Sequence, residues 1–510
     1  MANRPQTSPA SGPGGPGQPA EAVAGVPSPP AGAGPPGARA AFPTGRPTLR
    51  SLVTVHHGRE ISRLAWPTVL TMLSHTLMWT VDTAMLGRVS STALGAAGLG
   101  GILTWTGYSL VNQLSRITGT FVAQADGKGD DEAVGDYTWQ GIWLAIAGGL
   151  LLQTLGYFSY LGLPLTHNPA DVQALTYDYI KWRSVSAIAT QLTFALMGFF
   201  QGRRDVRVPM WAGLVANLLN VVLDLWLIFG WSGVELLGRR WLAVAPLGVA
   251  GAAIATSVSV CVNAAILAGC LWWPREFRRR YRTHRPRRPR PREIGDLARV
   301  GSPSAAENFI DMASLSIFTA LVGRAGAAQL AASQVTINLL SFSFMPVWGL
   351  TIAGSVLTGN WIGAGAPDVA ERYGRQVYKL GLYYMLGLAL ALILLRENVF
   401  RVFTADPAVL ALGGALAISA AIFQIGDGLR MIGAGILTGA GDTRFPMLQS
   451  LIVLWGLFIP LTWWIIVHEG GDVRGAWYGA TVIYLVQAAG LFWRVRSGKW
   501  KRIEIFSSQP

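Results

Sequence analysis

The sequence predicts an all-α integral membrane protein in which about twelve transmembrane helices form two six-helix lobes related by an internal repeat. Composition is the first reason for this prediction. Of the 510 residues, 51% are hydrophobic and only 13% are charged, whereas a soluble domain carries roughly 25% charged residues. The second reason is that three motifs recur in the same order at nearly one spacing. The chain therefore consists of two equivalent halves that need lipid as a solvent.

The repeat is clearest where Gly202–Met210 returns as Gly439–Met447, 237 residues later. Two further pairs of segments are shifted by 236 residues: Leu86–Arg88 with Val322–Arg324, and Gly127–Gly129 with Gly363–Gly365. Long internal repeats are a recurring construction of secondary transporters. The repeat therefore indicates a duplicated transporter.

Twelve apolar runs are long enough to cross a bilayer, whose core of about 30 Å takes roughly 20 helical residues. Helices are expected because barrel strands would show short alternating segments instead. The expected spans are 64–87, 95–119, 137–162, 176–200, 209–231, 247–273, 297–322, 328–358, 375–396, 409–436, 445–468 and 474–495.

These spans divide the chain into five regions. Residues 51–273 form the N-lobe and 297–496 the C-lobe, joined by a basic linker, 274–296. Residues 1–50 are rich in Pro, Gly, Ala and Ser without an apolar run, so we expect a disordered tail rather than a cleaved signal peptide. A short tail, 497–510, follows the last span.

The net charge of +14 is concentrated in and beside the linker, since eleven arginines lie between Arg275 and Arg299. A basic loop beside a membrane span marks the cytoplasmic side. Counting spans from this loop places both termini in the cytoplasm, so the protein is expected in the cytoplasmic (inner) membrane. This location of the charge argues against nucleic acid as a partner and leaves membrane lipids as its surroundings.

Cofactor chemistry has no recognisable motif in this sequence. The only cysteines, Cys261 and Cys270, lie nine residues apart, which points them to opposite sides of one helix and fits neither a disulfide framework nor a metal cluster. No CxxC, HExxH or phosphate-binding glycine loop is present. We therefore expect no cofactor, and energy from an ion gradient of H⁺ or Na⁺ or from the substrate's own gradient.

Two acidic residues stand inside spans of the first half, where an unpaired charge costs about 2.5–3.5 kcal/mol on insertion scales. Asp82 lies seven residues after His75, on roughly the same helical face. Asp224 shares one helical stripe with Asn217 and Asn220. The functional interpretation is a protonatable group beside a cleft. The alternatives are that Asp82 caps the helix end and that the polar stripe packs against neighbouring helices.

Three more acids stand in spans of the second half. Glu307 and Asp311 are four residues apart, and Asp427 lies on a later span with Arg430 three residues beyond it. Carboxylates from two helices favour a cation, so a sodium ion bound by Asp311 and Asp427 is one hypothesis. The alternatives are that Glu307 is solvated near its helix end and that Arg430 neutralises Asp427 as a structural pair.

A family resemblance rests on several of these motifs in order. They are Val81–Gly87, the Gly-x-Gly loops at 127–129 and 363–365, the Arg-x-Pro-Met turns, Asn220–Asp224 with Ile228–Gly230, and Gly248–Thr256. Over about residues 58–496 the chain resembles the multidrug and toxic compound extrusion (MATE) transporters, NorM-like or DinF-like. The resemblance implies two six-helix lobes around a central cleft. It also implies a monomer that exports small organic, often cationic compounds by proton or sodium antiport.

The resemblance also implies roles for particular residues. Ion coupling or substrate contact in the cleft would fall to Asp82, Asn220, Asp224, Asp311 and Asp427. From their places in the spans, we expect His75, Asn217, Glu307 and Phe423 as further cleft-lining residues. Two features depart from the NorM-like pattern: Phe423 stands where tyrosine is usual, and Arg430 is an added cation. Aromatic side chains that could stack on a flat cation are Trp79, Trp105, Phe194, Phe199, Trp348 and Trp455.

Other classes of protein fit parts of the sequence. A lipid-linked saccharide flippase has the same general plan, but it would line its cleft with Arg or Lys, whereas the charges noted inside the spans are mainly acidic. A membrane-embedded transferase would need acids on an aqueous loop, and the one such group is Asp126, Asp130, Asp131 and Glu132. We expect the last three to cap the following helix instead. A receptor without flux would leave the intramembrane acids without a role.

Overall fold

The computed structural model describes residues 57–230, 234–236, 239–241, 245–404 and 406–507. The tail expected over residues 1–50 lies outside this part of the chain, as does the last part of the tail expected over 497–510. The described residues are almost entirely helical, which confirms the predicted fold class. A short antiparallel hairpin, β1 (Val234–Leu236) with β2 (Arg239–Trp241), is the one departure from all-α structure among them.

The first half of the chain supplies the helices that form the N-lobe. Two of its transmembrane passages are broken into consecutive helices, α3 with α4 and α6 with α7. The elements are α2 (Gly58–Val89), α3 (Ser91–Arg116), α4 (Thr118–Lys128), α5 (Asp131–Tyr157), η1 (Phe158–Leu161), η2 (Leu163–Thr166), α6 (Ala170–Ser184), α7 (Ala187–Gly202), α8 (Arg207–Phe229) and α9 (Gly248–Trp272).

The linker contributes α10 (Arg275–Arg280), and the second half supplies the C-lobe. Its elements are α11 (Pro291–Arg324), α12 (Ala327–Gly363), α13 (Pro367–Leu394), α14 (Arg396–Phe403), α15 (Pro407–Ala440), α16 (Arg444–Ser450), η3 (Leu451–Phe458), α17 (Ile459–Trp463), η4 (Trp464–His468), α18 (Val473–Ser497) and η5 (Lys499–Arg502). The segment from α16 to η4 is one continuous helix, Arg444–His468, with two stretches of π-helix.

A helix stands at each of the twelve predicted spans. By length and composition, nine of the helices in the described residues are apolar enough to cross a membrane, or ten when the bent pair α6 and α7 counts as one span. The helices α2 and α3 do not meet that standard. Both carry polar side chains along their length, including Asp82 on α2 and Arg116 on α3. Polar helices of this kind are expected around an aqueous cleft.

Helix ends follow local sequence signals. Ser90 and Asp130 accept hydrogen bonds from the backbone N–H of Ala93 (3.0 Å) and Ala133 (2.9 Å), which caps α3 and α5 as short polar residues do. Asp131 and Glu132 lie in the first turn of α5, so the loop acids cap a helix as predicted. Gly129 ends α4 with φ at 75°, a left-handed conformation that glycine adopts readily.

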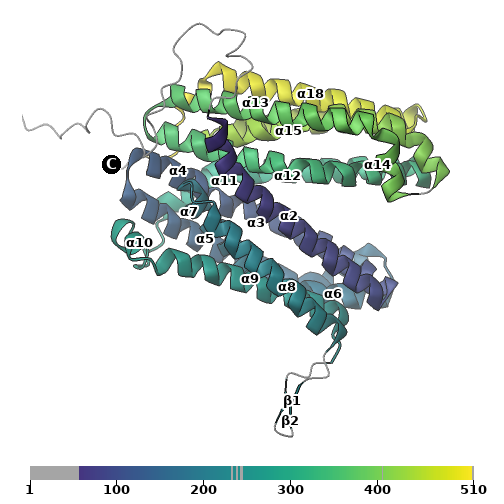
Figure 1. Cartoon of the computed structure of the whole chain (residues 1–510), viewed down its shortest axis with the longest axis horizontal. Helices are drawn as coiled ribbons and strands as arrows, with labels where there is room; N and C mark the ends of the chain where they lie inside the picture. The colour runs from purple at the N-terminus through teal and green to yellow at the C-terminus, as the bar shows by residue number, and fades with distance from the viewer. Residues whose placement is uncertain (1–56, 231–233, 237–238, 242–244, 405, 508–510) are drawn as a thin grey trace, which may run out of the picture. The chain divides into compact units, whose positions relative to one another are not determined.

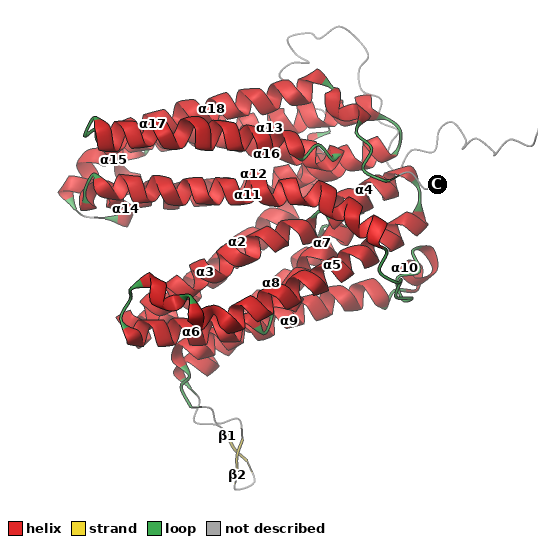
Figure 2. Cartoon of the chain, turned by 180° about the vertical axis from the view of Figure 1, so that it is seen from behind, coloured by secondary structure: helices red, strands yellow, loops and turns green. Residues whose placement is uncertain are grey.

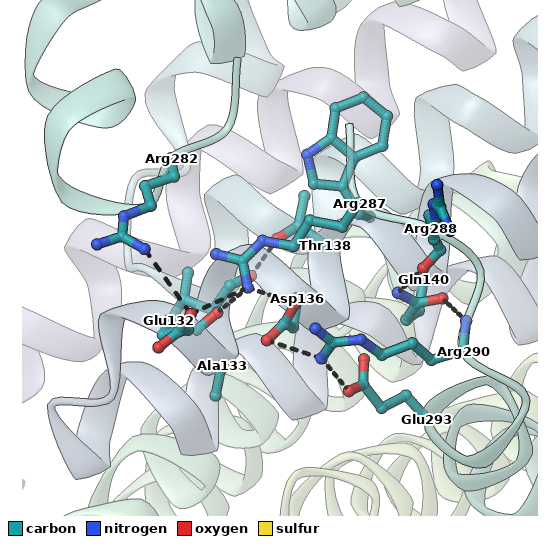
Figure 3. Close-up of polar contacts among 12 residues, drawn as sticks. Glu132, Ala133, Asp136, Thr138, Gln140, Arg282, Arg287, Arg288, Arg290 and Glu293 are labelled. Atoms are coloured by element: carbon teal, nitrogen blue, oxygen red, sulfur yellow. Dashed lines mark hydrogen bonds and ion pairs between the residues drawn. The ribbon is translucent and has the colours of Figure 1, made fainter. Parts of the chain in front are cut away.

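The basic linker is fastened to the start of α5 (Figure 3). Arg287 and Arg290 both pair with the buried Asp136, and Arg290 also pairs with Glu293 at 2.7 Å. Trp143 donates its indole N–H to the carbonyl of Arg287 at 2.8 Å. The linker arginines therefore anchor the linker to α5, in addition to making this region of the protein strongly basic.

The two lobes have distinct ends. Figure 1 shows α10 at one end of the helices, and α14 with the β1–β2 hairpin at the other. We call these the linker end and the hairpin end. In Figure 2 the two sets of helices lie close together near α4 and α11. There α12 packs against both α2 and α4, and α11 packs against α3. The lobes thus meet at the linker end.

The C-terminal segment 499–507 crosses this meeting point. Trp500 and Ile505 are almost completely buried, and Phe506 lies edge-on to Phe121 of α4 at 5.7 Å between ring centroids. Lys501 pairs with Glu371 of α13 at 2.6 Å, while the backbone N–H of Ser507 donates to Asp296 at 2.9 Å. The segment therefore ties C-lobe helices to N-lobe helices.

Replacing Ile505 by alanine is expected to lower the free energy of unfolding by about 2–4 kcal/mol, because a fully buried isoleucine loses its contacts and leaves a cavity. Thermal unfolding of the purified protein in detergent measures this change. The exposed neighbour Glu504 provides a matched control, since Glu504→Ala should leave the midpoint unchanged. Equal midpoints for both variants would show that the segment is not part of the folded core.

Candidate functional site

Two carboxyl groups meet inside the N-lobe. Asp82 of α2 and Asp224 of α8 lie within hydrogen-bonding reach of each other, and Asp224 is fully buried. Oδ1 of Asp82 and both oxygens of Asp224 are buried and accept no hydrogen bond from another described residue. Two ionised carboxylates are both acceptors, so they bond only when one of them carries a proton. A carboxyl pair this close can share one proton.

The surroundings of the pair agree in part with the sequence prediction. Asn220 is fully buried and donates to Thr256 of α9 at 3.5 Å, and Asn217 donates to Ser74 of α2 at 2.7 Å. Both asparagines of the α8 stripe thus bond to neighbouring helices, as the packing alternative proposed. Asp82 does not cap its helix, because α2 continues to Val89. His75, seven residues before Asp82 on α2, is exposed.

Two residues of this region were missed by sequence reasoning. Arg183, at the end of α6, lies within electrostatic range of Asp82 and His75, and Tyr179 hydrogen-bonds to Arg183. Both fall inside the predicted span 176–200. A cation within a span is as informative as an acid there, and that signal was available.

In the C-lobe, one guanidinium holds two carboxylates. Arg430 of α15 donates from Nη1 to Asp311 of α11 at 2.7 Å and from Nε to Asp427 at 2.7 Å. The guanidinium also lies over the ring of Tyr484 at 5.7 Å. The predicted pairing of Arg430 with Asp427 is confirmed, while the bond to Asp311 joins two helices. A planar guanidinium with several donors is well suited to bridge two acids in this way.

Glu307 completes this group of charges. It is 8% exposed, so the alternative of a solvated residue near the helix end is wrong. Asp311 and Arg430 lie within electrostatic range of its carboxylate. Three carboxylates therefore lie around one cation. The place between Asp311 and Asp427, where a sodium ion was one hypothesis, is filled by the guanidinium of Arg430.

A cavity of about 480 Å³ lies between the lobes. Its volume is typical of a site for a small organic molecule. Both lobes contribute to its wall, with Arg116, Ile117 and Thr120 from the N-lobe and Glu307, Asp311, Phe423, Asp427, Arg430, Trp348, Trp477 and Tyr484 from the C-lobe. Phe423 is among the lining residues, as expected.

The cavity does not include the N-lobe pair. Asp82, Asn220 and Asp224 are absent from its wall, as are His75 and Asn217. The sequence had suggested that all these residues line one cleft. The separation arises because α2 and α8 turn the carboxyls toward each other within the lobe. A proton on this pair would therefore act on the cavity through helix movement and not by direct contact with a ligand.

The linker end of the cavity is closed by a symmetric seal. Gln124 of α4 donates to the carbonyl of Gly439 at 2.9 Å. Asn360 of α12 donates to the carbonyl of Gly202 at 3.0 Å. Both donors and both acceptors are equivalent in the repeat, with shifts of 236 and 237 residues. Because of the repeat, the same hydrogen bond forms twice, donated once from each lobe to the other.

Glycines allow the close approach in this seal. A Cβ on Gly127 would lie 1.9 Å from the carbonyl oxygen of Asn360, and a Cβ on Gly363 would lie 1.9 Å from that of Gln124. No side chain fits at either position without movement of the opposite lobe. The repeat of Gly127 and Gly363, seen in the sequence, is therefore explained by contact between the lobes.

A two-lobed helical membrane protein with a closed seal at one end and a polar and aromatic cavity between its lobes has the architecture of a membrane transporter. The sequence comparisons specify the family. The MatE family profile matches residues 67–226 and 303–464. The chain belongs to the MatE family, which confirms the MATE resemblance and supports a transporter over the transferase alternative.

Curated relatives and solved structures agree with this assignment. The chain is 30% identical over 445 residues to the probable multidrug resistance protein NorM of Burkholderia pseudomallei, covering 86% of this chain and 92% of that protein. It is 28% identical over 454 residues to the probable NorM of Thermotoga maritima, covering 88% and 95%. It superposes with a TM-score of 0.74 on an outward-facing MATE transporter at 20% identity, covering 86% and 96%.

Proposed function

We propose that this protein exports small organic, cationic and aromatic compounds from the cytoplasm in exchange for protons, as a monomer in the cytoplasmic membrane with both termini inside. The closeness of the carboxyl group of Asp82 to the buried carboxyl group of Asp224 is the observation that carries the proposal. The relatives are named multidrug resistance proteins, which supports organic substrates. The buried carboxylates and aromatic rings of the cavity support cations.

The choice of protons over sodium rests on the C-lobe. Sodium needs several oxygen ligands with negative charge, yet Asp311 and Asp427 each already have an oxygen bonded to the guanidinium of Arg430. Among the described residues no group of three or more His, Cys, Asp or Glu side chains is arranged to hold a metal ion. The N-lobe pair, by contrast, offers buried oxygens without donors, which suits a proton.

The transport cycle follows from the closed linker end, which faces the cytoplasm in this orientation. A proton from outside reaches Asp82 and Asp224 and changes the packing of α2 against α8. Helix α2 transmits this change to α12, because Gly349 of α12 lies against the backbone of Ala65. Since α12 lines the cavity, its movement releases the substrate outward. The protein then closes at the hairpin end and opens at the linker end, and the pair of Asp82 and Asp224 returns its proton to the cytoplasm.

The energetics constrain the stoichiometry. One proton exchanged for one monovalent cation moves no net charge, so the membrane potential, worth about 2.3 kcal/mol per charge per 100 mV, contributes nothing to this exchange. Each unit of pH difference supplies about 1.4 kcal/mol. A one-to-one exchange therefore sustains roughly a tenfold substrate gradient per pH unit.

Arg430→Gln is expected to create a sodium dependence that the wild type lacks. Removal of the guanidinium leaves the buried carboxylates uncompensated, which costs about 3–5 kcal/mol, and sodium can then take its place. The measurement is thermal unfolding in detergent, in sodium chloride against choline chloride at equal ionic strength. Sodium should raise the midpoint of the variant and leave that of the wild type unchanged.

A second buried ion pair provides the control for this experiment. Arg494 pairs with Asp442 at 2.7 Å, away from the cavity wall, so Arg494→Gln should be destabilised without recovery in sodium. Stabilisation of the wild type by sodium, to the same extent as Arg430→Gln, would contradict the account of the C-lobe.

A further inference from the structure

A second pocket, outside the cavity between the lobes, is lined mainly by basic side chains. It has a volume of about 560 Å³, and its described lining residues are His57, Arg59, Glu60, Arg63 and Arg207. The three arginines are exposed, and none of them forms an ion pair with another described residue. We call this group of five residues the arginine pocket.

The acid of the arginine pocket is already bonded to residues outside it. Glu60 accepts a hydrogen bond from the hydroxyl of Tyr373 on α13 at 2.7 Å and pairs with Arg204 at 3.4 Å. Arg204 lies two residues after Gly202, whose carbonyl takes part in the seal, so the pocket is at the linker end. Three unpaired guanidinium groups therefore stand beside one carboxylate that has its own partners, and the pocket has an excess of positive charge.

Two helix N-termini add to this charge. Arg59 lies in the first turn of α2, and Arg207 is the first residue of α8, which packs against α2. Neither helix is capped by the side chain of the residue before it. The N-terminus of a helix carries a partial positive charge and favours anions. The dipoles of both helices and the arginines thus favour the same kind of ligand, one with negative charge.

The arginine pocket lies at the depth of lipid headgroups. Trp66 follows Arg63 by three residues and Trp211 follows Arg207 by four, so each tryptophan is about one helical turn deeper than its arginine. The tryptophan side chains are 46% and 62% exposed, and neither lines the cavity between the lobes. Exposed tryptophan in membrane proteins is enriched at the boundary between headgroups and hydrocarbon. The arginines therefore stand among the phosphates of the surrounding lipid.

We propose that the arginine pocket binds the phosphate of one anionic phospholipid, of which phosphatidylglycerol is the simplest example. Arg63 from α2 and Arg207 from α8 donate to the phosphate oxygens, for which a planar guanidinium with several donors is well suited. Trp66 and Trp211 contact the glycerol region, and the acyl chains continue along the exposed apolar surface. A zwitterionic lipid is disfavoured, because its ammonium group meets the excess positive charge. The inference concerns a lipid partner and does not depend on the proposed transport activity.

Native mass spectrometry of the purified protein in a non-ionic detergent tests this inference. Dioleoylphosphatidylglycerol and dioleoylphosphatidylcholine are added separately, and the dissociation constant of the first bound lipid is measured for each. The wild type should bind phosphatidylglycerol at least about tenfold more tightly than phosphatidylcholine. The double variant Arg63→Gln with Arg207→Gln should weaken binding of phosphatidylglycerol by about tenfold or more and leave that of phosphatidylcholine within about twofold.

A charge-matched double variant provides the control. Arg496→Gln with Arg502→Gln removes the same charge from exposed positions near the end of the chain and should bind phosphatidylglycerol as the wild type does. Both double variants should keep the wild-type unfolding midpoint without lipid, because all four side chains are exposed. Equal weakening in both, or none in the pocket variant, would overturn the inference. Displacement of the lipid by inorganic phosphate at equal concentration would assign the pocket to a soluble phosphate instead.

Discussion

Asp224→Asn is expected to abolish export driven by a pH gradient while leaving substrate affinity unchanged. Asparagine has the shape of the carboxylic acid and still donates a hydrogen bond to Asp82, but it cannot take up and release a proton. Because Asp224 is absent from the cavity wall, the dissociation constant of ethidium should not move. The initial rate of ethidium efflux from cells should fall by more than about tenfold, a difference of 1.4 kcal/mol or more.

Two further variants complete this experiment, one at Asp82, the partner of Asp224, and one at the distant Asp178. Asp82→Asn should give the same loss, since the pair acts as one proton site. Asp178, exposed on α6 of the same lobe, provides the matched control, and Asp178→Asn should export at the wild-type rate. Full pH-driven export by Asp224→Asn, with normal expression, would remove the N-lobe pair from the coupling mechanism.

Gly363→Ala is expected to prevent closure of the linker end and to stop transport. Its new methyl group would lie 1.9 Å from the carbonyl oxygen of Gln124, so the lobes must separate. Overpacking of this kind costs about 1–3 kcal/mol, enough to shift a balance between two conformations by about fivefold or more. Gly127→Ala should act in the same way, because its methyl group would meet Asn360 in the symmetric position.

Cysteine labelling separates loss of the seal from loss of the fold. Ser355 lines the cavity, so Ser355→Cys can be introduced after Cys261 and Cys270 are replaced. An impermeant maleimide should reach this cysteine from the linker side in Gly363→Ala but not in the background protein. Gly295, exposed on α11 with open space around its Cα, is the control glycine. Equal labelling of both glycine variants would show that the seal does not depend on Gly363.

Local features of the sequence predicted the helices and the repeat well. Apolar runs and capping residues such as Ser90 and Asp130 act over a few neighbours, so their effect is visible in one dimension. Intramembrane acids could be recognised singly, because each is costly in an apolar run. The pairing of Arg430 with Asp427 was also accessible, since the two residues are three apart on one helix.

Contacts between helices could not be predicted from local features of the sequence. The meeting of Asp82 with Asp224, the bond from Arg430 to Asp311, and the seal formed by Gln124 and Asn360 all depend on how distant helices pack. The repeat identified Gly127 and Gly363 as equivalent, but only the packing shows that each meets the opposite lobe. Arg116 and Arg183 also stand inside predicted spans, where a cation is as costly as an acid, but the side chains that each one contacts depend on helix packing.

The most direct test of proton coupling is ethidium transport in proteoliposomes that contain the wild-type protein, with the membrane potential held at zero. A pH gradient and a sodium gradient are imposed separately. The account predicts transport under the pH gradient alone and none above the protein-free background under the sodium gradient alone. Transport driven by sodium in the absence of a pH difference would contradict it and return the coupling site to Asp311 and Asp427.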